Sequence, residues 1–138
     1  MIILDTNVVS ETMKPAPARR PMEWLGAQPA MDVYLTTITE AEVLTGIALM
    51  PAGRRRNLVK TAWEALLEQL YGERILSFDR GAAKEVAHVV SSRRRLGRPI
   101  ALADAQIAAI ARSHGALLAT RNVADFTGCG VGILDPWA

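Results

Sequence analysis

The sequence contains one cysteine, Cys129, and only two histidines, His88 and His114, in 138 residues. A single cysteine excludes an internal disulfide framework, and the shortage of sulfur and imidazole ligands excludes a cysteine-rich zinc site. We interpret Cys129, which lies between two glycines, as a small residue in a turn, and both histidines as structural or solvent-facing side chains. Any metal chemistry must therefore use oxygen ligands, which favours Mg²⁺ or Mn²⁺ over zinc.

Aromatic residues and long hydrophobic runs are also scarce. Aromatic side chains make up 5% of the chain, and Trp24, Trp63 and Trp137 fit core or interface positions better than an exposed platform for stacked bases. No apolar run approaches the roughly 20 residues of a membrane span. The N-terminus has neither a basic region nor a long apolar core. We expect a soluble, cytoplasmic protein with no membrane association.

Length and charge indicate one domain with a dispersed surface charge. A chain of 138 residues can bury roughly 70% of the surface of its extended form, and no repeat or interdomain linker divides residues 1–138. The net charge is +2 and the pI about 9.0, with most of the positive charge in short arginine clusters. These clusters are Arg19-Arg20, Arg54-Arg55-Arg56 and Arg93-Arg94-Arg95 with Arg98.

Short apolar segments that predict strands alternate with segments whose apolar residues recur at helical spacing. The predicted strands are residues 2–4, 33–37, 75–78, 117–119 and 131–134. The predicted helices are residues 6–13, 18–27, 39–50, 54–71, 80–96 and 101–113, with a helical turn at 122–126. Alternation predicts an α/β fold in which a mostly parallel central sheet is flanked by helices on both faces, an α/β/α sandwich.

Acidic and amide side chains fall where predicted strands end or predicted helices begin. In a parallel sheet with right-handed crossovers these transitions share the edge at which α/β proteins place ligands. Several carboxylates at one edge repel each other unless a cation compensates them, and a divalent metal is the simplest cation to do so. The positions are Asp5, Glu42, Asp104, and Asn122 with Asp125.

Each of these residues also has a purely structural interpretation, which the residues alone leave open. Asp5 and Asn122 are suitable N-caps, and Asp104 in the first turn of a helix would complement the helix dipole. Glu42 follows Thr39 at capping-box spacing. The structural and the chemical interpretations agree that these side chains lie at helix N-termini along one edge of the sheet.

Four segments resemble the successive motifs of PIN-domain ribonucleases. They are Leu4–Asn7, Thr39–Gly46, Ala103–Ala109 and Thr120–Phe126. The tail, Leu134–Trp137, is similar to that of the VapC/FitB-type toxins of bacterial type II toxin–antitoxin systems. The resemblance covers nearly the whole chain in the same order and spacing, and the four motifs are specific only in combination.

The resemblance implies a PIN-like fold and a metal-dependent endoribonuclease. In such an enzyme Asp5, Glu42 and Asp104 hold Mg²⁺ or Mn²⁺ and activate water, and we expect Glu42 to take the proton of that water as a second role. The fourth family position is usually Asp and here is Asn122, which puts a second tightly held metal in doubt, although Asp125 could contribute through water.

The resemblance also assigns supporting residues and partners. Thr6 and Thr120 would hydrogen-bond the metal ligands, and Asn7 would fix the turn after Asp5. The partners implied are an RNA substrate, a cognate antitoxin protein and a second copy of the chain in a homodimer, with the possibility of a higher toxin–antitoxin assembly.

Arginine is the main candidate for RNA contact. Arg54, Arg55 and Arg56 begin a predicted helix, where the dipole disfavours cations, so a role in binding phosphate stands beside a structural one. Residues 93–95 end a helix, where cations are favoured, and there the structural interpretation is stronger.

Two alternatives to the nuclease remain. A catalytically silent PIN-like module that binds RNA or protein would account for Asn122 at the fourth position. A haloacid-dehalogenase-like phosphohydrolase also starts with an apolar strand that ends in Asp, but Asn7 stands where its second Asp is expected.

Overall fold

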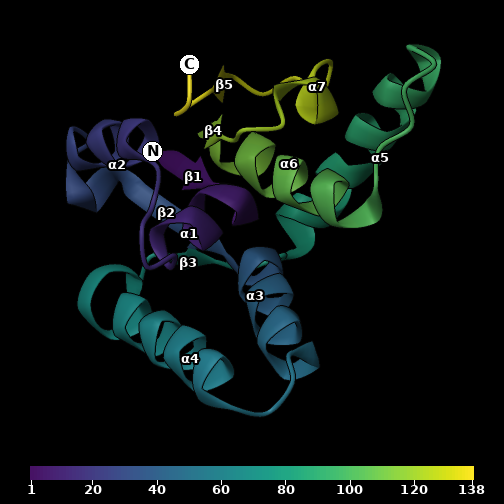
Figure 1. Cartoon of the computed structure of the whole chain (residues 1–138). Coiled ribbons are helices and arrows are strands. Elements are labelled where there is room, and N and C mark those ends of the chain that lie inside the picture. The colour runs from purple at the N-terminus through teal and green to yellow at the C-terminus, as the bar shows by residue number, and fades with distance from the viewer.

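The computed structural model describes all 138 residues, and its five strands form one sheet in the order β3-β2-β1-β4-β5 (Figure 1). Every neighbouring pair is parallel. The strands are β1 Ile2–Leu4, β2 Val33–Thr36, β3 Ile75–Leu76, β4 Leu117–Ala119 and β5 Ile133–Leu134. The predicted parallel sheet is confirmed, although β3 and β5 are shorter than the apolar runs that predicted them.

Seven α-helices connect or follow these strands. They are α1 Thr6–Thr12, α2 Arg19–Gly26, α3 Thr37–Leu49, α4 Arg54–Leu66, α5 Arg80–Arg95, α6 Leu102–His114 and α7 Val123–Phe126. A 3₁₀ turn covers Ala30–Asp32, and a π-helical segment at Leu67–Tyr71 extends α4. The single helix predicted over 54–71 is therefore two segments, because the hydrogen bonds widen to a π-helical turn at its end. None of the helices combines the length and hydropathy of a membrane span.

Helices cover both faces of the sheet, as the sequence predicts. Alternate side chains of β1 enter different cores, because successive residues of a strand point to opposite faces. Ile2 and Leu4 belong to a cluster with Trp63 of α4, and the same cluster includes residues of α1 and α3. Ile3 belongs to a second cluster with Ile107 of α6, which also contains residues of α5. The two buried clusters on either side of β1 define the α/β/α sandwich (Figure 1).

The parallel register brings the carboxyl ends of the two central strands together. Leu4 of β1 pairs with Ala119 of β4, and the backbone N–H of Asp5 donates to the carbonyl of Ala119 at 2.9 Å. Asp5 and Thr120 consequently leave the sheet side by side, although 115 positions separate them in the chain. This is the sheet edge at which ligands bind in α/β proteins.

The start of α3 differs from the prediction. Its N-cap is Thr36, whose hydroxyl accepts a hydrogen bond from the backbone N–H of Thr39 at 3.1 Å. The predicted capping box of Thr39 and Glu42 is therefore wrong, and Glu42 lies in the second turn with no capping role. The sequence pattern could not separate the two starts, because a threonine stands at both positions and either hydroxyl can cap a helix.

Three leucines in the apolar helical pattern of residues 39–50 and 54–71 are exposed on the α3–α4 hairpin. Leu44 and Leu49 of α3 have 49% and 81% of their surface exposed, and Leu58 of α4 has 60% exposed. The buried residues of α3 are Thr39, Val43 and Ile47. The hairpin extends beyond the sheet (Figure 1), so one side of each helix has no core to cover.

Arg93, at the end of α5, is the one arginine buried in the fold. Its Nε donates to the carbonyl of Arg98 at 2.7 Å, and its Nη1 donates to the carbonyls of Ala124 and Thr127 at 3.1 and 2.6 Å. The side chain joins the loop before α6 to both ends of α7, which supports the structural interpretation of this arginine cluster at Arg93.

Replacing Arg93 by leucine should lower the free energy of unfolding by about 2–4 kcal/mol, because three backbone carbonyls lose a charged donor. Urea denaturation would measure the loss. The matched change Arg94→Leu, at the exposed neighbour, should alter stability by no more than about 0.5 kcal/mol. Equal stability of the two variants would contradict a structural role for Arg93.

Candidate active site

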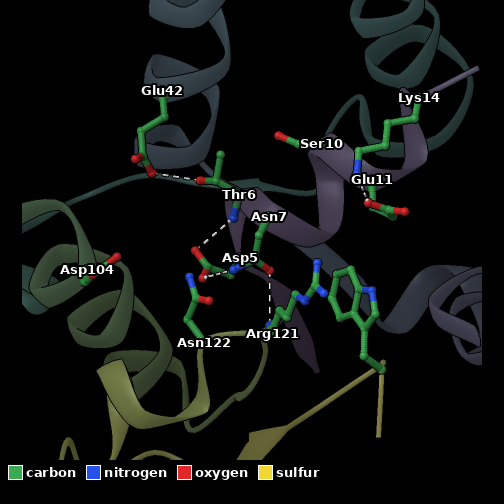
Figure 2. A pocket seen from close by; sticks show the side chains of 11 residues that line it. Asp5, Thr6, Asn7, Ser10, Glu11, Lys14, Glu42, Asp104, Arg121 and Asn122 are labelled. Atoms are coloured by element: carbon green, nitrogen blue, oxygen red, sulfur yellow. Dashed lines mark hydrogen bonds and ion pairs between the residues drawn. The ribbon is translucent and has the colours of Figure 1, made fainter. Parts of the chain in front are cut away.

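The largest cavity, about 420 Å³ in volume, opens at the carboxyl ends of β1 and β4 (Figure 2). Its walls come from α1, α3, α6, the segment after β4 and the C-terminal tail. All but one of its lining residues are polar or charged, which fits a polar substrate better than an apolar ligand. The lining residues are Asp5, Thr6, Asn7, Ser10, Glu11, Lys14, Glu42, Asp104, Arg121, Asn122 and Trp137.

Asp5 lies at the base of this cavity and also caps α1. Its Oδ1 accepts from the backbone N–H of Thr6 at 2.8 Å. Its Oδ2 accepts from the hydroxyl of Thr120 at 2.8 Å and from the amide of Asn7 at 3.1 Å. Burial raises the pKa of Asp5, and the hydrogen bonds from Thr120 and Thr6 offset part of that rise. Asp5 is therefore both the N-cap of α1 and a residue of the cavity, and one side-chain position serves both roles.

Glu42 reaches the cavity from α3. It is exposed, and its Oε1 accepts from the hydroxyl of Thr6 at 2.7 Å. The Thr6 hydroxyl also lies 3.1 Å from the hydroxyl of Thr39. Thr6 thus connects two carboxylates, through its backbone N–H to Asp5 and through its side chain to Glu42.

Asp104 occupies the first turn of α6 and is partly buried. Burial and then the negative charges of Asp5, Asp125 and Glu42 raise its pKa to about 6, against a smaller opposite effect of Arg93. No hydrogen bond holds its side chain, in contrast to the carboxylate of Asp5. The raised pKa therefore reflects burial first and, after it, the negative charge that the fold gathers at this edge.

Asn122 lines the cavity, whereas Asp125 does not. Asn122 precedes α7, but its side chain makes no capping hydrogen bond, so the structural interpretation of this side chain is wrong. Its backbone N–H donates to the hydroxyl of Thr120 at 3.0 Å, which directs the residue toward Asp5. Asp125 is exposed and acts on the site only through its charge on Asp104.

The donor set suits a hard divalent cation in its chemistry. Asp5, Glu42 and Asp104 offer carboxylate oxygens, which Mg²⁺ and Mn²⁺ prefer. As the side chains stand, no three acidic, histidine or cysteine side chains are close enough to hold one ion. Asp5 is held by three hydrogen bonds, whereas Glu42 has one, from Thr6, and Asp104 has none, so the side chains of Glu42 and Asp104 are less constrained than that of Asp5.

Five residues of the cavity, Ser10, Glu11, Lys14, Arg121 and Trp137, were not predicted from the sequence. Glu11 is buried, pairs with Lys14 at 2.6 Å and accepts from the backbone N–H of Ala18 at 2.7 Å. The guanidinium of Arg121 lies over the ring of Trp137, 5.2 Å from its centroid. Arg121 lies inside the fourth family motif, so its position was a usable signal. Trp137 was assigned to the core or an interface, because the sequence does not show that the tail folds back to the sheet edge.

The arginines predicted to contact RNA do not line the cavity. Arg54, Arg55 and Arg56 begin α4, and Arg55 borders a neighbouring groove that shares Ser10 and Lys14 with the cavity. The remaining interpretations agree with the fold. Both histidines are exposed, and Cys129 is buried between Gly128 and Gly130, whose φ angles of 82° and 72° fit a turn.

Comparison with known families identifies the class. The family described as PIN domain matches residues 2–126, and the chain belongs to it. Within this family it is similar over 137 residues to three proteins: Toxin FitB of Neisseria gonorrhoeae (39% identical), VapC ribonuclease Y4jK of Sinorhizobium fredii (39%) and plasmid stability protein StbB of Pseudomonas syringae pv. tomato (40%). These alignments cover 99% of this chain and 98–99% of each relative.

Solved structures give the same result. The structure of FitAB bound to an IR36 DNA fragment matches with a TM-score of 0.92 and 39% identity, covering 100% of this chain and 96% of the other. FitAcB from Neisseria gonorrhoeae matches with a TM-score of 0.87 and 40% identity, covering 99% of both chains. The alternative of a haloacid-dehalogenase-like phosphohydrolase therefore rests on the apolar strand before Asp5 alone, because the similarity does not extend to the rest of the chain.

Replacing Asp104 by asparagine should stabilise the metal-free protein at pH 7.5 and not at pH 4. A carboxyl group whose pKa is higher in the folded state, about 6 against 3.8, favours folding at low pH, and this contribution is lost as the pH rises through 6. We expect a gain of roughly 1 kcal/mol at pH 7.5, allowing for screening of a partly exposed group.

Urea denaturation with a chelator present would measure this difference at both pH values. Asp32→Asn, at an exposed position in the 3₁₀ turn before β2, is the matched control and should change stability little at either pH. A destabilised Asp104→Asn variant at pH 7.5 would contradict an unfavourable charge at this position.

Proposed function

We propose that this chain is a Mg²⁺- or Mn²⁺-dependent endoribonuclease, acting as the toxin of a toxin–antitoxin pair. The observation that carries the proposal is the convergence of Asp5, Glu42, Asp104 and Asn122 on one polar cavity of a PIN domain. The names of its relatives support the reaction. They include a VapC ribonuclease and, at 28% identity, a tRNA(fMet)-specific endonuclease VapC of Shigella flexneri.

Asp5, Glu42 and Asp104 would hold the cation. Asp5 is already oriented by three hydrogen bonds, so it would be the fixed ligand, while the other two would close on the ion. A bound dication would supply Lewis acidity for the phosphodiester and would lower the pKa of a water molecule bound to it. Asn122 offers an amide oxygen in place of a fourth charge, which is consistent with a single tightly bound ion.

The remaining steps belong to the side chains of this protein. Glu42 is exposed to solvent within the cavity and is hydrogen-bonded only through Thr6, so it can accept a proton from the attacking water. The Thr6 hydroxyl keeps its carboxylate directed at the site. Asp5 remains ionised when it binds the cation, because a positive charge favours the carboxylate form and offsets the effect of burial on its pKa.

A protein partner would bind the exposed apolar surface. Leu44, Leu49 and Leu58 are exposed apolar side chains on the α3–α4 hairpin, and exposed apolar side chains that gather on one surface mark interaction sites. The similar structures titled FitAB and FitAcB support an antitoxin as the partner. The homodimer stays a prediction from the family resemblance.

Expression of the chain alone should arrest cell growth, and Asp5→Asn should restore it and lower RNA cleavage by about 100-fold or more, because the oriented ligand loses its charge. Growth curves and the cleavage of total cellular RNA with Mn²⁺ would test this. Asp32→Asn should remain toxic and active. Unchanged toxicity of Asp5→Asn would contradict the proposed mechanism.

Mn²⁺ should bind the purified chain with about one ion per protein, and Asp104→Asn should weaken binding by about 10-fold or more. Isothermal titration calorimetry measures both values without any need for activity. Absence of binding by the wild-type chain would favour the catalytically silent alternative, in which the cavity serves only to bind a partner.

A further inference from the structure

Arg121 differs from the other cation of the cavity because it forms no ion pair, and the Glu11 carboxylate acts on it only at longer range. The Lys14 ammonium is engaged by Glu11 at 2.6 Å. The Arg121 side chain is exposed and takes part in no ion pair and no side-chain hydrogen bond. The guanidinium thus brings a positive charge outside any ion pair, together with free N–H donors, to a cavity whose other walls are mostly acidic or polar (Figure 2).

The position of Arg121 is fixed from two sides. Its backbone N–H donates to the Oδ1 of Asn7 at 3.2 Å, and the preceding residue, Thr120, donates to Asp5. Its guanidinium lies 5.2 Å from the centroid of the Trp137 ring. One hydrogen bond of its own backbone, the anchored neighbour Thr120 and one cation–π contact therefore hold this arginine beside the carboxylates.

Trp137 is a firm support for this contact. The indole is partly buried and packs against the cluster that contains Ile2 and Leu4. Its backbone N–H donates to the Oδ1 of Asp135 at 2.9 Å, which closes the turn that returns the tail to the sheet edge. A guanidinium that stacks on an aromatic ring keeps its edge free, and that edge carries the N–H groups that fit a phosphate.

An RNA strand must approach several carboxylates, so its phosphates meet repulsion at the site. We propose that Arg121 contacts a backbone phosphate next to the one that is cleaved, and that Trp137 is the positioning residue that holds the guanidinium in place. This inference rests on the proposed ribonuclease function and adds a substrate contact to it. We favour a phosphate over the edge of a base as the group that Arg121 contacts. A single exposed arginine attracts the charged backbone of any RNA strand, and a contact with the backbone does not depend on sequence.

The binding test uses fluorescence anisotropy of a labelled 12-nucleotide single-stranded RNA of mixed sequence, with Mg²⁺ and in the Asp5→Asn background to prevent cleavage. Adding Arg121→Gln should raise Kd about 10-fold. It should also reduce the slope of log Kd against log salt by about 0.7, the value for one phosphate contact on a single strand. Arg121→Lys should retain the slope and lose about 3-fold in affinity, because lysine keeps the charge without the fork.

Arg80→Gln is the matched control. Arg80 is exposed, and the next residue, Gly81, lies close to Ser113 at the C-terminal end of α6, whereas Asp104 is at the N-terminal end of that helix. The Arg80→Gln variant should leave Kd and the salt slope unchanged. Trp137→Phe keeps an aromatic face and should retain most of the affinity, whereas Trp137→Leu should lose about as much as Arg121→Gln.

Cleavage of total RNA by the enzyme with an intact Asp5 separates the possible results. Arg121→Gln should raise KM with little change in kcat, since a phosphate beside the reacting one is bound equally before and during reaction. Normal cleavage with an unchanged Kd and salt slope in Arg121→Gln would overturn the phosphate contact and leave the ribonuclease standing. A wild-type chain that neither binds nor cleaves RNA would overturn the proposed function, and this contact with it.

Discussion

The hydrogen bonds to the Asp5 carboxylate join the parts of the molecule on which the site depends. One oxygen accepts from the start of α1, and the other accepts from Asn7 and from Thr120 after β4. A buried carboxylate costs free energy, and these donors reduce that cost by stabilising its charge. The same carboxylate therefore fixes the helix start, connects two strand ends that are distant in sequence, and provides an oriented acid in the cavity.

Much of the site could be predicted because, in a parallel sheet, the residues that follow strands and begin helices lie at the same edge of the sheet. Asp5 and Asp104 are a strand exit and a helix entry, and both belong to the same sheet edge. Glu42 was harder to interpret, since only the structure shows that Thr36 caps α3 and leaves Glu42 without a capping role. Arg121 and Trp137 could not be paired from the sequence, because cation–π contacts between a loop and a tail have no spacing rule.

The apolar pattern was a weaker guide than the acidic one. Leu44, Leu49 and Leu58 occupy positions that a helix in a larger core would bury, yet they are exposed on the α3–α4 hairpin. Helical periodicity reports which residues share a face, and not whether another element of the same chain covers it. The discrepancy is itself informative, since an uncovered apolar face on a stable fold is the expected form of a surface that another protein covers.

Arg93 couples the architecture to the electrostatics of the site without reaching the cavity. Its guanidinium fastens both ends of α7, and its charge acts on Asp104 against the surrounding acids. Loss of this side chain would release the segment that carries Asn122 and remove a counter-charge in one step. If arginines were replaced one by one and only enzymatic activity were measured, Arg93 would consequently be mistaken for a residue that binds nucleic acid. A parallel measurement of folding stability would distinguish its structural role from a contact with the ligand.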